Sequence, residues 1–127
     1  MSGKKFGPVI AVILLFTACS RPETPAPPPA PPPIGDAARG KQLATQQGCN
    51  VCHIVPGIEG AQGSLGPTLA GVASRPKISN GVVTNTPENL AKLIENPQAM
   101  NPESTMPALG ISTADSRDIA AFLLTLK

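Results

Sequence analysis

Two cysteines and a histidine near the middle of the chain have a spacing that can do chemistry. Residues 49–53 are Cys-Asn-Val-Cys-His, the pattern by which a haem group is attached covalently. Each thiol can add across one vinyl group of the macrocycle, and His53 is then held close enough to ligate the iron. We therefore predict that Cys49 and Cys52 bind one haem c and that His53 is an iron ligand.

Two other chemistries use a Cys-x-x-Cys pair. A dithiol redox motif needs a βαβ setting, whereas the residues around Cys49 and Cys52 have a helical pattern. A structural zinc site needs four ligands, but the chain has one histidine and one further cysteine, Cys19, far upstream. Dithiol and zinc chemistry remain as alternatives to haem attachment.

The start of the chain has the features of an export signal. Lys4 and Lys5 precede an apolar run over residues 9–16, and small residues follow at 17–19, as in a signal with a cleavage site. The apolar run is shorter than the roughly 18–20 residues that a spanning helix needs, so an uncleaved anchor is the less favoured alternative. We expect residues 1–19 to hold the signal.

Cys19 explains the odd number of cysteines. The small residues before it resemble a bacterial lipoprotein signal, although Phe16 stands where such signals usually have leucine. The resemblance implies cleavage before Cys19, which then carries a lipid; simple secretion with cleavage after Cys19 is the alternative. An unpaired cysteine in an exported chain needs such an explanation. No disulfide is expected, because all three thiols form thioethers.

Residues 20–33 form the expected tether. The stretch from Arg21 to Pro33 is dominated by proline, which has a fixed φ and no amide hydrogen and so excludes helix and central strand. An extended polyproline chain rises about 3.1 Å per residue, which gives a span of about 40 Å. We expect a spacer that holds a domain off a membrane surface; a proline-rich recognition motif is the alternative.

The remaining residues, 34–127, predict one small all-α domain. Asp36, Thr86 and Ser112 are suitable N-caps, and apolar residues follow at helical spacing. No run alternates with a period of two, so strands should be minor. Basic patches and phosphate-binding loops are lacking, and we expect no nucleic-acid partner. The expected helices are residues 37–47, 87–96 and 113–126.

The order of these features resembles a class I cytochrome c over nearly all of residues 34–127. A helix is followed by the Cys-x-x-Cys-His motif, a Gly-Pro-x-Leu segment, a helix ending in Glu-Asn-Pro, a Met-Pro pair and a last helix. The resemblance implies N- and C-terminal helices that cross around one covalently bound haem. Gly40 matches the glycine at that crossing, and Ile119 and Phe122 match its apolar partners.

The resemblance also implies four further features of the site. The carbonyl of Pro67 accepts a hydrogen bond from His53, and Arg75 lies near a haem propionate, an exposed cation being the alternative for Arg75. Met106, which precedes a proline, supplies the sixth iron ligand, with core packing as the alternative for any methionine. Met100 matches a packing side chain. A thioether ligand opposite histidine raises the reduction potential.

Two residues depart from the mitochondrial members of the family. Asn85 stands about where those proteins have a tryptophan near a propionate, and Leu93 about where they have a haem-facing tyrosine. Two hydrogen-bond donors are therefore missing. The reduction potential of those proteins cannot be carried over to this chain.

These features predict a membrane-tethered electron carrier rather than an enzyme, monomeric and placed by its lipid on the periplasmic face of a bacterial membrane. Its partners would be membrane redox complexes such as a terminal oxidase. From Ile34 onward seven basic residues balance seven acidic ones, so docking should be apolar and nearly independent of salt. The alternatives are a haem-based ligand-binding or sensor module and an accessory subunit of a larger oxidase or dehydrogenase.

Overall fold

The three longest helices of the described residues each begin at a side chain that caps them. The structure, a computed structural model, describes residues 3, 34–60 and 63–127. Asp36 accepts hydrogen bonds from the backbone of Ala38 and Arg39, Thr86 from Asn89 and Ser112 from Asp115. These bonds satisfy N–H groups that have no partner within the first turn. The helices are α1 (Ala37–Gln46), α3 (Pro87–Glu95) and α5 (Thr113–Leu123).

Shorter elements connect these helices. β1 and β2 form a two-stranded antiparallel sheet in which Lys77 pairs with Thr84 and Ile78 pairs with Val83. The all-α fold class is thus confirmed, with strands as a minor part. The short elements are α2 (Cys49–Cys52), a 3₁₀ turn η1 (Val72–Ser74), β1 (Lys77–Ile78), β2 (Val83–Thr84) and α4 (Pro97–Met100).

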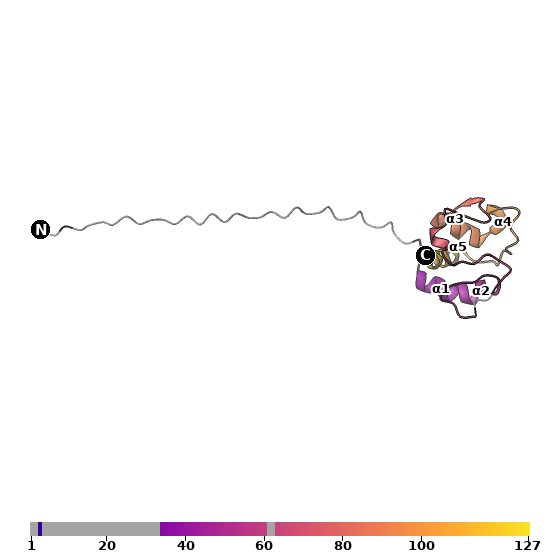
Figure 1. Ribbon diagram of the computed structural model, residues 1–127, viewed down its shortest axis with the longest axis horizontal. Coiled ribbons are helices and arrows are strands. Elements are labelled where there is room, and N and C mark those ends of the chain that lie inside the picture. Colours follow the sequence, from indigo (N-terminus) through magenta and orange to yellow (C-terminus); the bar gives the residue numbers. More distant parts are fainter. Residues whose placement is uncertain (1–2, 4–33, 61–62) are drawn as a thin grey trace. The chain divides into compact units, whose positions relative to one another are not determined.

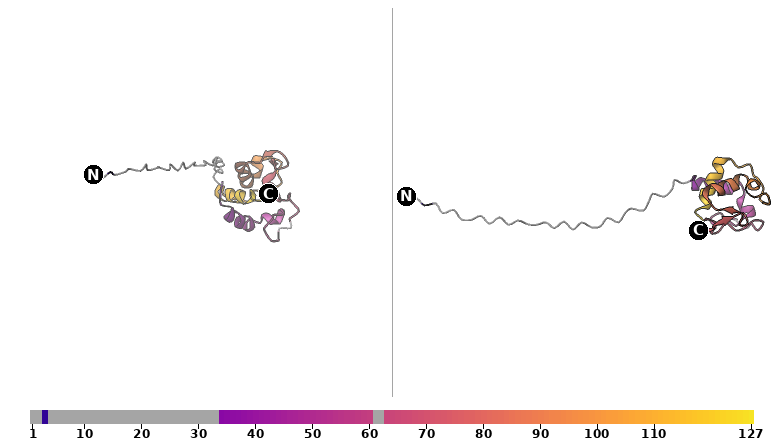
Figure 2. Two further views of the ribbon diagram at one scale, coloured as in Figure 1. Left: turned by 60° about the vertical axis from the view of Figure 1, so that its left-hand side comes forward. Right: turned by 90° about the horizontal axis from the view of Figure 1, so that it is seen from above.

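The first and last helices of the domain cross at Gly40. A β-carbon on Gly40 would lie 1.8 Å from the carbonyl oxygen of Asp118, so only glycine permits this separation. Ile119 and Phe122, on α5, are both buried. Figure 1 shows α1 and α2 in one half of the domain and α3 and α4 in the other, and Figure 2 shows α5, in yellow, packed between them.

An ionic cluster fastens the start of α1 to α5. The guanidinium of Arg39 donates to both Asp115 and Asp118. Asp118 also accepts a hydrogen bond of 2.7 Å from the backbone N–H of Asp36. The hydrogen bond from Asp36 is the largest cause that lowers the pKa of the Asp118 carboxyl below its ordinary value, and the bond from Arg39 adds to it. In turn, the carboxylates of Asp118 and Asp115 raise the pKa of Arg39.

The core is built from small and aliphatic side chains, with Phe122 as its one buried aromatic among the described residues.

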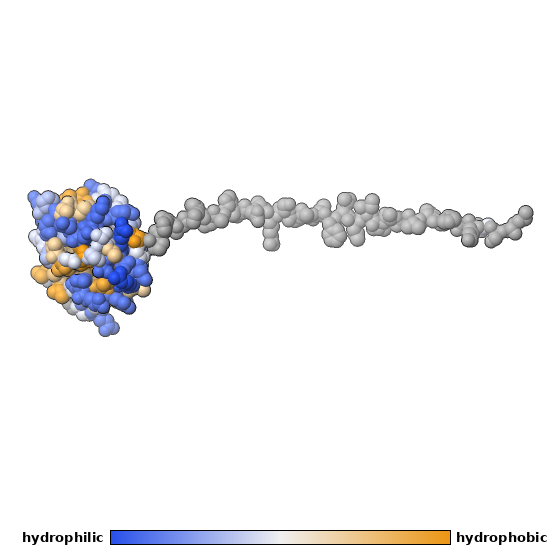
Figure 3. Space-filling view, turned by 180° about the vertical axis from the view of Figure 1, so that it is seen from behind, coloured by the Kyte–Doolittle hydropathy of each residue, from blue (hydrophilic) through white to orange (hydrophobic). Residues whose placement is uncertain are grey.

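In the described part of the chain, no helix is both long and apolar enough to span a membrane. Figure 3 shows apolar residues, in orange, reaching the surface in a band between hydrophilic areas. Exposed aliphatic side chains include Val51, Leu65 and Leu109.

Candidate cofactor site

A cavity of about 890 Å³ lies between the two halves of the domain. This volume falls within the roughly 300–1,000 Å³ typical of small-molecule and cofactor sites. One part of the wall is aliphatic and comes mainly from η1, α3 and α5, and another part is polar. The aliphatic wall includes Val72, Leu90, Ile94, Ile119 and Leu123, and the polar wall includes Arg75, Lys77, Ser79, Asn80, Ser104 and Thr105.

The short helix α2 directs the Cys-x-x-Cys-His motif into this cavity. Gly48, with a φ of 70°, reverses the chain between α1 and α2, a conformation that glycine adopts without strain. Cys49 and Cys52 are three residues apart and therefore share one face of the helix. Both thiols and the ring of His53 line the cavity, and both cysteines are free.

The imidazole of His53 is oriented by the backbone of Pro67. Its Nδ1 atom lies 2.7 Å from the carbonyl oxygen of Pro67. Because a carbonyl oxygen only accepts hydrogen bonds, Nδ1 must carry the proton and donate it. The lone pair of the neutral ring is then on Nε2, the atom available to a metal.

Two glycines permit the close approach of the loop that holds Pro67. A β-carbon on Gly66 would lie 2.4 Å from Cε1 of His53, and one on Gly63 would lie 2.3 Å from the carbonyl carbon of Cys52. The N–H of Gly66 donates to the carbonyl of Cys52 at 2.8 Å. The role of Gly63 could not be predicted from the sequence, because nothing in its local pattern shows which segment it faces.

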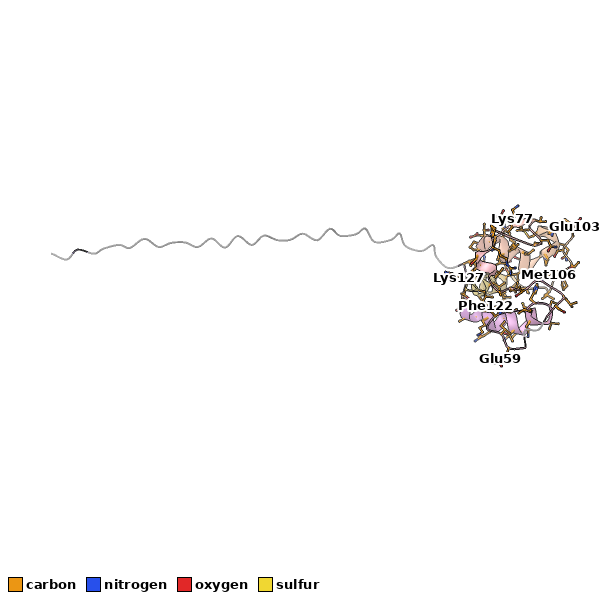
Figure 4. All side chains as sticks on the ribbon, in the orientation of Figure 1. Glu59, Lys77, Glu103, Met106, Phe122 and Lys127 are labelled. Carbon is orange, nitrogen blue, oxygen red and sulfur yellow. The ribbon has the colours of Figure 1, made fainter. Side chains whose placement is uncertain are left out.

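Of the two methionines in the domain, only Met106 lines the cavity. Figure 4 shows Met106 between the half with α3 and α4 and the half with α1 and α2. Met100, at the end of α4, is partly buried and packs against the hydrophobic core. The structure thus places Met106 at the cavity and Met100 against the core.

Arg75 lies half-buried in the cavity wall. One of its terminal nitrogens donates to the carbonyl oxygens of Thr68 and Ala70, both at 2.7 Å. The side chain therefore supports the segment that follows Pro67. It also places a cation at the polar part of the wall, where an acidic group of a ligand can be paired.

The β1–β2 turn is part of the same polar wall, and sequence analysis missed it. Ser79 and Asn80 have positive φ values of 50° and 55°, and Gly81 follows with 82°. Asn-Gly between aliphatic residues is a strong hairpin signal, so the sequence did carry this information. Lys77 precedes the turn and adds a second cation to the cavity wall.

Asn85, which the family resemblance puts about where other members have a tryptophan, ties two backbone segments together. Its Nδ2 atom donates to the carbonyls of Val72 and Arg75, both at 2.8 Å. Its Oδ1 atom is buried and has no partner among the described residues. Asn85 is not among the residues that line the cavity, so its amide supports the wall from behind.

The donor set fits a haem better than a dithiol or zinc site. Burial raises the pKa of the Cys49 thiol, whereas a redox-active dithiol requires a lowered one. No group of three or more His, Cys, Asp or Glu side chains that could hold a metal occurs among the described residues. An aliphatic cavity that collects two thiols, an imidazole, a thioether and two cations suits an apolar macrocycle with acidic side groups.

Comparisons with known proteins give a family match and similar individual proteins. The family model described as "Cytochrome c" matches residues 37–127. The chain is 33% identical over 103 residues to cytochrome c2 of Rhodomicrobium vannielii, covering 72% of this chain and 79% of that protein. It is also 33% identical over 92 residues to cytochrome c oxidase subunit 2 of Alkalihalophilus pseudofirmus, covering 72% of this chain but only 26% of that protein.

Proposed function

The chain belongs to the cytochrome c family of electron carriers, which bind haem c covalently, and we propose that it transfers single electrons by means of one such group. In this proposal Cys49 and Cys52 form the thioethers. His53 and Met106 would hold the iron, and no coordination position would then be open for a substrate.

One observation carries the proposal: both thiols, the imidazole and the thioether of Met106 line one cavity. When bound, the haem supplies a one-electron change at its iron. The chain contributes the rest. Pro67 orients His53 through the 2.7 Å hydrogen bond, the aliphatic wall would exclude water from the haem, and Arg75 and Lys77, which line the polar part of the cavity, would pair with the haem propionates.

Acid–organic extraction of the denatured protein tests the attachment. Haem should stay on the polypeptide because thioethers do not dissociate, and replacing both Cys49 and Cys52 with alanine should release it. The absorption spectrum of the oxidised protein then separates a carrier from a sensor. A six-coordinate low-spin spectrum is expected, whereas a five-coordinate spectrum would favour a module that binds a ligand at iron.

The docking surface is proposed to be apolar. Leu65 is 82% exposed at the cavity, and Val51 and Leu109, 69% and 42% exposed, line a smaller hollow that shares Met106 with it. Without a net charge in the domain, long-range steering would be weak. Electron-transfer rates to bacterial membranes should change little with salt, and a tenfold fall between low and physiological ionic strength would contradict this.

The tether and lipid anchor remain proposals about residues 1–33, which lie outside the described residues apart from Gly3. We propose export, lipidation of Cys19 and residence at the periplasmic face of a bacterial membrane, where tethering raises the effective concentration of partners. The lipidated protein should partition into detergent, whereas Cys19→Ser should yield a soluble or an unprocessed form. Mass spectrometry that finds a mature N-terminus without lipid would contradict the anchor.

The partners are proposed to be membrane redox complexes. Similarity to a protein named cytochrome c oxidase subunit 2 supports a terminal oxidase as the electron acceptor. It equally supports the alternative that the chain works as an accessory subunit. Isolation of the protein from solubilised membranes distinguishes these: a stoichiometric complex indicates a subunit, and a monomer indicates a carrier.

A further inference from the structure

The loop that carries Met106 has little internal support. The methionine loop, residues 101–107, contains no helix or strand. Its internal hydrogen bonds are short-range: the N–H groups of Ser104, Glu103 and Met106 donate to the carbonyl of Asn101 (2.9 Å), the Oδ1 atom of Asn101 (3.1 Å) and the hydroxyl of Ser104 (3.3 Å). Contacts that the loop makes with residues outside it must therefore determine where the thioether lies.

Asn101 provides the first of these contacts. It is only 5% exposed, and its Oδ1 atom accepts a hydrogen bond from the N–H of Glu103 at 3.1 Å. Its Nδ2 atom donates to the hydroxyl of Ser79 at 3.1 Å. Ser79 lies in the β1–β2 turn, so this bond joins the methionine loop to the β1–β2 turn, and both segments contribute to the polar wall of the cavity.

Gln98 provides the second contact, from α4. Its Nε2 atom donates to the carbonyl oxygens of Met106 at 2.6 Å and Ser104 at 3.2 Å. The helix itself is fixed, because Asn96 caps it and Pro97 is fully buried. Gln98 therefore holds the backbone of Met106 against an element that does not belong to the loop.

We propose that Asn101 and Gln98 are positioning residues that keep the thioether of Met106 on the iron. The proposal rests on the proposed function, in which Met106 is the sixth ligand. A ligand from solution can bind only in the fraction of molecules whose thioether has left. Each amide contact favours the loop conformation in which the thioether binds the iron. Loss of a contact should therefore raise the apparent affinity of the oxidised protein for an external ligand.

Titration of the oxidised, haem-loaded protein with imidazole tests this proposal. A net hydrogen bond contributes on the order of 1 kcal/mol, which corresponds to about a fivefold change in an equilibrium constant. Asn101→Ala, Gln98→Ala and Ser79→Ala should each tighten imidazole binding by about that factor. Gln42→Ala, an exposed glutamine on α1, is the matched control and should not change it.

A double variant separates positioning from general destabilisation. Because Asn101 and Ser79 share one hydrogen bond, the double alanine variant should bind imidazole about as tightly as Asn101→Ala alone. Unfolding by denaturant is measured alongside. Unchanged imidazole affinity in Gln98→Ala and Ser79→Ala, with or without lower stability, would overturn the proposal. Ser79→Ala deletes only a hydroxyl and keeps the test available if Asn101→Ala fails to fold.

The underlying ligation is checked in the same samples. The weak long-wavelength absorption band of a sulfur–iron(III) bond should be present in the wild type and absent in Met106→Ala. If the band shows this pattern but the Asn101 and Gln98 variants bind imidazole no more tightly than Gln42→Ala does, only the positioning proposal fails. Absence of the band from the wild type would overturn the ligation and the positioning proposal together.

Discussion

A β-carbon on Gly66 would lie 2.4 Å from Cε1 and 2.6 Å from Nδ1 of His53. The imidazole and the loop backbone are therefore closer than any residue with a side chain would allow. The next residue, Pro67, accepts the hydrogen bond from Nδ1. Glycine at position 66 is thus a condition for the orientation of His53.

Gly66→Ala should displace either the ring of His53 or the loop. Overpacking of this kind typically costs about 1–3 kcal/mol, and the hydrogen bond to Pro67 should lengthen or break. We expect lower stability together with a changed reduction potential, because the basicity of the ligating nitrogen depends on that bond. Denaturant unfolding and potentiometry measure the two effects. Ser64→Ala, at an exposed neighbour, should leave both unchanged.

Met106→Ala and Met100→Ala should have different effects. Loss of the thioether that lines the cavity should lower the potential, remove the sulfur–iron band and open the iron to added ligands. Met100→Ala should keep the band but lower stability by about 2–3 kcal/mol at most, because Met100 is only partly buried. Loss of the band in Met100→Ala alone would identify Met100 as the ligand.

Gly40→Ala should be among the most destabilising substitutions in the domain. The added β-carbon would meet the backbone of Asp118 at 1.8 Å, and a carbonyl cannot turn aside as a flexible side chain can. Separation of α1 from α5 should cost about 3 kcal/mol or more. Thermal unfolding followed by circular dichroism measures this loss. Gln42→Ala on the same helix is the control, and equal stability of the two variants would contradict the prediction.

Asp118 should make stability depend on pH in the acidic range. Its pKa is lower in the folded chain than the unperturbed value of about 3.9. Its contribution is therefore complete above about pH 3.9 and is lost as the pH falls through the folded pKa. Asp118→Asn should be less stable than the wild type at pH 7, and this difference should shrink below about pH 4.

Unfolding midpoints measured between neutral and acidic pH test this dependence. Glu59→Gln is a matched control, because Glu59 is exposed. Its difference from the wild type should stay nearly constant over the same range. A difference for Asp118→Asn that widened on acidification would mean that the sign of the pKa shift is wrong.

Local rules predicted the capped helices well. The side chains of Asp36, Thr86 and Ser112 each accept hydrogen bonds from N–H groups of the turn that follows. The type and spacing of a few neighbouring residues are therefore enough to predict where these helices begin. The prediction that Asn96-Pro97 ends the second helix is confirmed, but the sequence analysis did not predict the short helix that begins there. Asn96 ends α3 and also caps α4, because proline at the first helical position can start a helix as readily as it prevents continuation of the preceding one.

The supports of the candidate site depend on contacts between distant segments. The hydrogen bond from Asn101 to Ser79 spans 22 positions, and Gln98 reaches Met106 from an exposed position on a short helix. Neither residue has a local pattern that distinguishes it from an ordinary polar surface residue. The motif at 49–53 could be recognised because its chemistry depends on adjacent residues.

The hydrogen bond from Asp36 to Asp118 has a mechanical consequence. If the chain is anchored by a lipid at Cys19, drag on the domain pulls on the residues ahead of Asp36. That load reaches α5 directly through Asp118, the Arg39 ion pairs and the helix crossing at Gly40. The methionine loop makes none of these contacts, so the attachment of the tether and the support of the loop depend on separate residues.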